Sequence, residues 1–100
     1  MNKKFYSLLG LCQKAGRLKS GEFQTESAIK TGEAWLVIIA EDASENTKKK
    51  FKDSAKFYEV ECIEAGTKAE LGAAIGKEMR TSLAVCDEGF YKSFMKLSEG

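Results

Sequence analysis

The stretch "AWLVIIA", residues 34–40, decides the fold. It is a continuous apolar run rich in β-branched residues, and it is too short for a buried helix. A run of this kind predicts a central strand that is covered on both faces of its sheet. The segments before and after it must therefore supply the covering layers.

Working outward from this strand, the apolar pattern predicts helices and strands in strict alternation. The helices carry apolar residues three and four positions apart, and the strands are short apolar runs. Alternation of this kind gives a mainly parallel or mixed sheet between helices, an α/β three-layer α/β/α domain. A chain of 100 residues (1–100) forms one such domain. The expected helices are 3–16, 20–32, 41–60, 67–76 and 87–100, and the expected strands are 17–20, 34–40, 60–63 and 81–86.

Polar residues at the helix starts predict how the helices are capped. Thr67 and Glu70 have the spacing of a capping box. The helix at 41–60 has two possible caps, Asp42 with Glu45 or Ser44 alone. We expect its inward stripe to be Phe51, Ala55 and Tyr58.

The composition excludes several classes of function. The chain has three separated cysteines and no histidine, which leaves no zinc site, and we expect reduced thiols, no metal and no cofactor. No apolar run approaches the roughly 20 residues of a membrane span, so we expect a cytoplasmic protein without a membrane partner. The net charge is +1, yet residues 1–30 hold six basic and two acidic residues and residues 47–56 hold five basic and one acidic. The two basic segments could form one basic face.

Two acidic pairs, Glu41-Asp42 and Asp87-Glu88, follow predicted strands. Ligands often bind beyond the carboxyl ends of strands, so a metal-assisted or phosphoryl-transfer site is one interpretation. Helix capping is the more common role of acidic residues at helix starts. Because histidine and a phosphate-binding glycine loop are both absent from the sequence, we expect no enzymatic activity.

The helix start at 20–32, "SGEFQTESAIKTG", is the first candidate binding site. Ser20 and Gly21 could expose backbone N–H donors, and Gln24 could donate to or accept from a base edge. Phe23 has two interpretations that the sequence leaves open. It either stacks on an unpaired base or turns into the core.

Two further segments also have two interpretations each. The loop and helix start "GTKAELG", residues 66–72, could take a phosphate on its backbone N–H groups or could be a simple capping box. The lysine run at 48–52 is either a solvated helix face or a contact to nucleic acid.

Taken together and in order, these stretches resemble the ribosomal protein L7Ae family of RNA-binding proteins, and its small bacterial members above all. The likeness rests on "LLGLCQKAGRLKSGE", "AIKTGEAWLVIIAEDASENTKKKF", "GTKAELGAAIGK" and "AVCDEGF", which span nearly the whole chain. It implies an α/β/α sandwich with a four-stranded mixed sheet. Many members grip kink-turns in RNA with the start of the second helix and the loop before the fourth, here 21–27 and 64–68.

The kink-turn readers of that family carry G-x-N-E-x-x-K at the second helix. In this chain Gly21 is kept, Phe23 takes the asparagine position, Gln24 the glutamate position and Ser27 the lysine position. Glutamine can still accept a hydrogen bond at a base edge, whereas phenylalanine cannot make the polar contacts of asparagine. The resemblance therefore implies the fold more firmly than the kink-turn.

The sequence predicts a monomeric RNA-binding protein that docks on ribosomal or other structured RNA, with the ribosome or other translation and transcription components as further partners. One alternative is a protein-interaction module on the same fold, with Phe23 as an apolar anchor. The other is an enzyme that uses the acidic pairs. The expected RNA-binding residues are Lys14, Arg17, Lys19, Ser20, Gly21, Phe23, Gln24, Ser27, Gly66, Thr67 and Lys68.

Overall fold

The apolar run forms the central strand β2 (Leu36–Ile39), and all four of its residues are buried. The computed structural model describes residues 3–99. Within that range the order of helices and strands matches the predicted alternation. The other elements are α1 (Lys3–Lys14), β1 (Leu18–Ser20), α2 (Glu22–Lys30), α3 (Glu45–Phe57), β3 (Glu61–Glu64), α4 (Lys68–Ala74), β4 (Ser82–Val85) and α5 (Glu88–Glu99).

The four strands form one mixed sheet in the order β1-β4-β2-β3. Strand β4 runs antiparallel to both of its neighbours, and β2 runs parallel to β3. In the register, Ile38 lies between Leu83 of β4 and Ile63 of β3. The mixed four-stranded sheet is thus confirmed.

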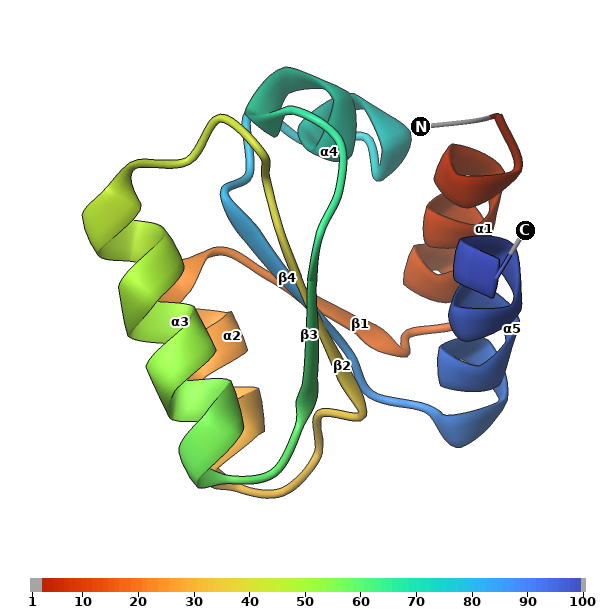
Figure 1. Cartoon of the computed structure of the whole chain (residues 1–100). Helices are drawn as coiled ribbons and strands as arrows, with labels where there is room; N and C mark the ends of the chain where they lie inside the picture. Colours follow the sequence, from red (N-terminus) through yellow and green to blue (C-terminus); the bar gives the residue numbers. More distant parts are fainter. Residues whose placement is uncertain (1–2, 100) are drawn as a thin grey trace.

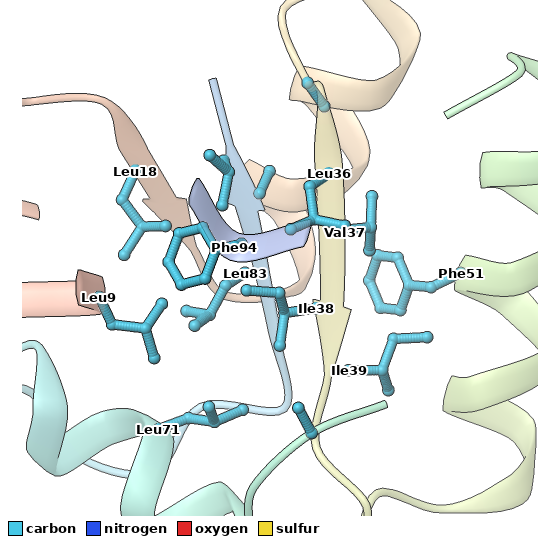
Figure 2. Packing of buried hydrophobic residues seen from close by; sticks show 14 of the residues in the cluster. Leu9, Leu18, Leu36, Val37, Ile38, Ile39, Phe51, Leu71, Leu83 and Phe94 are labelled. Carbon is cyan, nitrogen blue, oxygen red and sulfur yellow. The ribbon is translucent and has the colours of Figure 1, made fainter. Parts of the chain in front are cut away.

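Helices cover both faces of this sheet, as an α/β/α sandwich requires. Figure 1 shows α2 and α3 together on one side and α1 and α5 together on the other, with α4 at one end. Side chains of β2 alternate between the two layers. In Figure 2, Ile38 lies on the side of Leu9 and Phe94, while Val37 and Ile39 lie on the side of Phe51.

Helix α3 is shorter than the sequence predicts. Ser44 is its cap, because the Ser44 hydroxyl accepts a hydrogen bond from the Thr47 N–H at 3.2 Å. The helix ends at Phe57, and the left-handed φ of +59° at Glu59 turns the chain back toward β3. Tyr58 consequently points outward with 42% of its surface exposed, so the prediction that it lies inward was wrong.

The other helix ends follow the sequence signals. The Thr67–Glu70 capping box is present at the start of α4. Gly16, just beyond α1, has a φ of +72°, which suits glycine at a helix end. Across residues 3–99, none of the helices has both the length and the apolar character needed to cross a lipid bilayer.

Candidate nucleic-acid interface

Helix α2 begins beside the first residue of strand β4. The Gly21 N–H donates to the Ser82 carbonyl at 3.0 Å, and the Gly21 carbonyl accepts from the Thr25 N–H at 3.0 Å. The φ of Gly21 is +96°, in the region that favours glycine, and this turn redirects the chain from β1 into α2. The Gly21 N–H is therefore used within the fold, and the expectation that it is exposed to a ligand was wrong.

Phe23 lies on the outer surface of α2 with 84% of its side chain exposed. The buried side chains of this helix are Thr25, Ala28 and Ile29, which lie on the opposite side of the helix from Phe23. The interpretation of Phe23 as a core residue was wrong. Its ring is instead available for contact with another molecule.

A groove of about 350 Å³ runs beside Phe23 between α2 and α3. Ser27 lies one helical turn after Phe23, and Lys30 follows at the end of α2. Lys50 of α3 lies on the opposite wall. The exposed ring thus borders a shallow hollow that two lysines and two glutamates, Glu22 and Glu26, also line.

Two glutamates of α2, Glu22 and Glu26, are turned toward α3. The Ser54 hydroxyl donates to the Glu26 carboxylate at 2.6 Å, and the Thr47 hydroxyl donates to the Glu22 carboxylate at 3.5 Å. Gln24 is exposed and lies about 200° around the helix from Glu22. Gln24 therefore has a surface of its own, separate from the acidic side chains.

Arg80 joins the start of α2 to the start of α4, and sequence reasoning missed it. Its Nε donates to the Ser20 hydroxyl at 3.2 Å, and its backbone N–H donates to the Lys68 carbonyl at 3.1 Å. Its Nη1 donates to the carbonyl of Met79, whose side chain is 63% exposed. A cation directly before a buried strand was the available signal, but only the β1–β4 pairing shows that it reaches Ser20.

The loop before α4 is closed by protein carboxylates. The Thr67 N–H donates to Glu70 at 3.0 Å, and the Lys68 N–H donates to Asp42 at 2.8 Å. The Thr67 N–H, and after it the Tyr6 hydroxyl, hold the pKa of Glu70 below its ordinary value. Of the two interpretations of the segment at 66–72, the capping box is therefore the one present. The backbone N–H groups of Thr67 and Lys68 are occupied, whereas the Lys68 ammonium could contact a phosphate.

Two of the other predicted basic residues, Lys14 and Arg17, precede the start of β1, the end away from Gly21. The Arg17 carbonyl accepts from the Cys86 N–H just after β4, and the Arg17 Nε lies 3.9 Å from the Asp87 carboxylate. Arg17 and Gly21 lie at opposite ends of β1. Four residue-to-residue steps of extended chain separate them, which is about 13 Å. Lys14 ends α1 and so precedes Arg17, and Lys19 pairs with Ala84 in mid-strand. Lys14 and Arg17 are therefore not gathered around Phe23, and Lys19 lies in the strand between them and Gly21.

One residue of each acidic pair, Asp42 and Asp87, accepts from a backbone N–H at a helix start. Most of the lysine run is ion-paired. Asp87 accepts from the Phe90 N–H at 2.9 Å at the start of α5. Lys48 and Lys52 both pair with Glu64. Within residues 3–99, no group of three or more histidine, cysteine, aspartate or glutamate side chains could hold a metal ion.

A sequence model of the "Ribosomal protein L7Ae/L30e/S12e/Gadd45 family" matches residues 3–95. The chain belongs to this family. An RNA-binding protein YlxQ of Enterococcus faecium is 44% identical over 98 residues, which cover 98% of this chain and 94% of that protein. An RNA-binding protein YlxQ of Bacillus subtilis (strain 168) is 39% identical over 94 residues, 94% of each chain.

Solved structures share the fold of this L7Ae-family chain. A Bacillus halodurans protein described as of unknown function has a TM-score of 0.93 and 37% identity, with 99% of this chain and 100% of that chain covered. A Giardia lamblia 15.5kD RNA binding protein has a TM-score of 0.81 and 18% identity, with 99% and 91% covered. The second likeness shows the fold alone.

Proposed function

We propose that this protein binds structured RNA with one surface at the start of α2. The docking surface, as we call it, consists of Ser20, Gly21, Phe23, Gln24, Ser27, Lys68, Met79 and Arg80. The observation that carries the proposal is the exposed Phe23 on the same helix start that Ser20 and Arg80 tie to α4. The RNA-binding names of relatives that match nearly the whole chain support it.

Each part of the docking surface has a distinct task in this proposal. Phe23 stacks on an unpaired base, a contact that depends little on base identity. Gln24 donates to or accepts from a base edge. Arg80 and Lys68 neutralise phosphates, and Gly21 sets the backbone turn that presents the helix.

The RNA we propose is a kinked, kink-turn-like element, in ribosomal or other structured RNA of the cytoplasm. With Phe23 in the asparagine position, the protein holds the kink by stacking where relatives use a polar contact. Lys14 and Arg17 precede the start of β1, and Lys19 lies within it. These three residues contact phosphates only where the RNA extends in that direction. The protein acts as a monomer and performs no chemical step.

A titration against a kink-turn RNA and a plain duplex of equal length, at several salt concentrations, tests this function. We expect tight binding that selects the kink-turn. The affinity should fall with salt by a slope that reflects only a few phosphate contacts. Equal, weak and steeply salt-dependent binding to both RNAs would contradict the proposal and favour a protein partner for Phe23.

The variant Arg80→Gln tests whether a positive charge on the docking surface matters more to RNA binding than a positive charge elsewhere on the molecule. It keeps a donor for the Ser20 hydroxyl but removes the charge, so we expect a weaker kink-turn affinity and a salt slope lower by about one. Lys49→Gln is the matched control, because Lys49 lies on α3 and pairs with Asp53 at 2.7 Å. An equal loss in both variants would show that only net charge matters.

A further inference from the structure

The face of the molecule opposite α2 and α3 carries an apolar groove. It lies between α1 and α5, which Figure 1 shows side by side and antiparallel. Its volume is about 380 Å³, and Leu8, Leu11 and Leu97 provide its apolar surface. Leu11 is 58% exposed, so the groove leaves an aliphatic side chain in water. Exposed leucine in a groove between two helices suits a further helix.

The two charged residues among those that line the groove are both lysines. Lys3 and Lys4 line one end of it. Helix α1 contains no acidic residue, and its exposed residues include Lys14 as well. On α5, Lys96 stands in the last turn, and Lys92 is offset by Glu88 at 3.4 Å. The rim of the groove is therefore basic around an aliphatic floor.

We propose that the α1–α5 groove binds an acidic amphipathic helix of a partner protein. The leucines would receive the apolar stripe of that helix, and the lysines would pair with glutamates or aspartates on its flanks. Helix α1 has 12 residues and is about 18 Å long, so a partner helix of about 12 residues would span it.

The same observations argue against other occupants. RNA bases stack on aromatic rings, and none of the residues that line the groove is aromatic. A second copy of this chain bound through the same groove would place Lys3, Lys4 and Lys14 opposite the same three lysines, and these like charges repel. The groove also lies across the sheet from α2, which carries Phe23, so a partner could bind while RNA is bound.

A pair of synthetic peptides tests this proposal on the full chain. Both are helical, of about 18 residues, with leucine at i, i+3, i+4 and i+7, and the flanks carry glutamate in one and lysine in the other. We expect the glutamate peptide to bind at least about ten-fold more tightly by fluorescence anisotropy, with its affinity falling as salt rises. Equal binding of the two peptides, or no binding of either, would overturn the proposal.

Three variants locate the site. Leu11→Gln and the double variant Lys3→Glu, Lys4→Glu should each weaken the glutamate peptide about ten-fold or more, with thermal unfolding unchanged because these side chains are exposed. Phe57→Gln is the matched control, since Phe57 is 78% exposed on α3. Displacement of the peptide by kink-turn RNA would assign the groove to RNA. Loss of a dimer in Leu11→Gln would assign it to a second copy.

Discussion

Phe23 leaves most of its ring in water, which folding alone does not favour. A phenylalanine gains free energy by burial, and the chain buries Phe5, Phe51 and Phe94 almost completely. Beside Phe23, the helix buries Thr25 instead, a polar residue. The proposed stacking of Phe23 on RNA would account for this exchange of an apolar residue outside for a polar residue inside.

The variant Phe23→Ala should lower affinity for the kink-turn RNA by about five- to thirty-fold, or about 1–2 kcal/mol, because a stacking partner is lost. The free energy of unfolding should change by less than about 0.5 kcal/mol, since the ring is exposed. RNA titration and urea unfolding measure the two quantities. Phe57→Ala, with a comparably exposed ring on α3, should leave RNA binding unchanged. If Phe23→Ala binds as well as the wild type, the docking surface lies elsewhere.

Two hydroxyls near Gly21 are buried without a hydrogen-bond partner among the described residues, those of Thr25 and Ser82. Thr25→Val replaces its hydroxyl with a methyl group of similar size. We expect the free energy of unfolding to rise by about 1 kcal/mol, because the desolvation cost of the hydroxyl is removed. Chemical denaturation checks this. A loss of stability would mean that a buried water bonds the Thr25 hydroxyl.

The position of Phe23 could not be predicted from the sequence because α2 has a weak apolar pattern. Its inner side consists of Thr25, Ala28 and Ile29, of which only Ile29 is large and apolar. By size and hydrophobicity alone, Phe23 was as good a candidate for the core. The apolar spacing that identified α1 could not show which side of α2 faces the core, because α2 has too few apolar residues.

At the scale of elements, α4 packs against the segment at 77–78, which leads to Arg80. The Lys77 N–H donates to the Gly72 carbonyl at 2.9 Å. A Cβ added to Gly72 would lie 1.9 Å from the Glu78 carbonyl oxygen, so only glycine permits this contact. The backbone at 77–78 thus packs directly against α4, and this contact fixes the position of the chain that leads to Arg80.

We expect Gly72→Ala to lower the free energy of unfolding by about 1–3 kcal/mol, because the backbone at 77–78 must move away. The shift should also displace Arg80 and weaken RNA binding. Gly89→Ala is a control in another helix, where the added Cβ would meet only the Asp87 side chain, at 3.2 Å. Unfolding curves and RNA titrations of both variants decide. Unchanged stability in Gly72→Ala would contradict this view of the contact.

The start of α4 should depend on pH through Glu70. Its pKa is lowered in the folded state, chiefly by the Thr67 N–H and then by the Tyr6 hydroxyl. Because the folded-state pKa of Glu70 lies below the ordinary value of 4.5, ionised Glu70 stabilises the fold fully when the pH is above 4.5. This stabilisation is lost as the pH falls through the folded-state pKa. Denaturant midpoints should therefore favour the wild type over Glu70→Gln near neutral pH. The two should converge once the pH has fallen through the folded-state pKa of Glu70. A constant difference would show that ionisation of Glu70 plays no part.

At the scale of the whole molecule, local signals predicted the order of elements and the three layers. The capping box at Thr67 and the buried run at 34–40 depend on neighbouring residues, which a sequence displays directly. The contact between Arg80 and Ser20 depends on a strand pairing between distant segments, and no local pattern records it. The same reason explains why Arg17 was grouped with Phe23 and is found at the other end of β1.

The pairing of β1 with β4 also has a consequence for the synthesis of the protein. Within residues 3–99, strand β1 pairs only with β4, so Lys19 cannot pair until Ala84 has been translated. A nascent chain that ends before Ser82 lacks the acceptor for the Gly21 N–H, so α2 has nothing to start against. We expect a 1–79 fragment neither to unfold cooperatively nor to bind RNA. Translation would thus complete the proposed docking surface late and in one step, and we expect truncated products not to compete for the RNA.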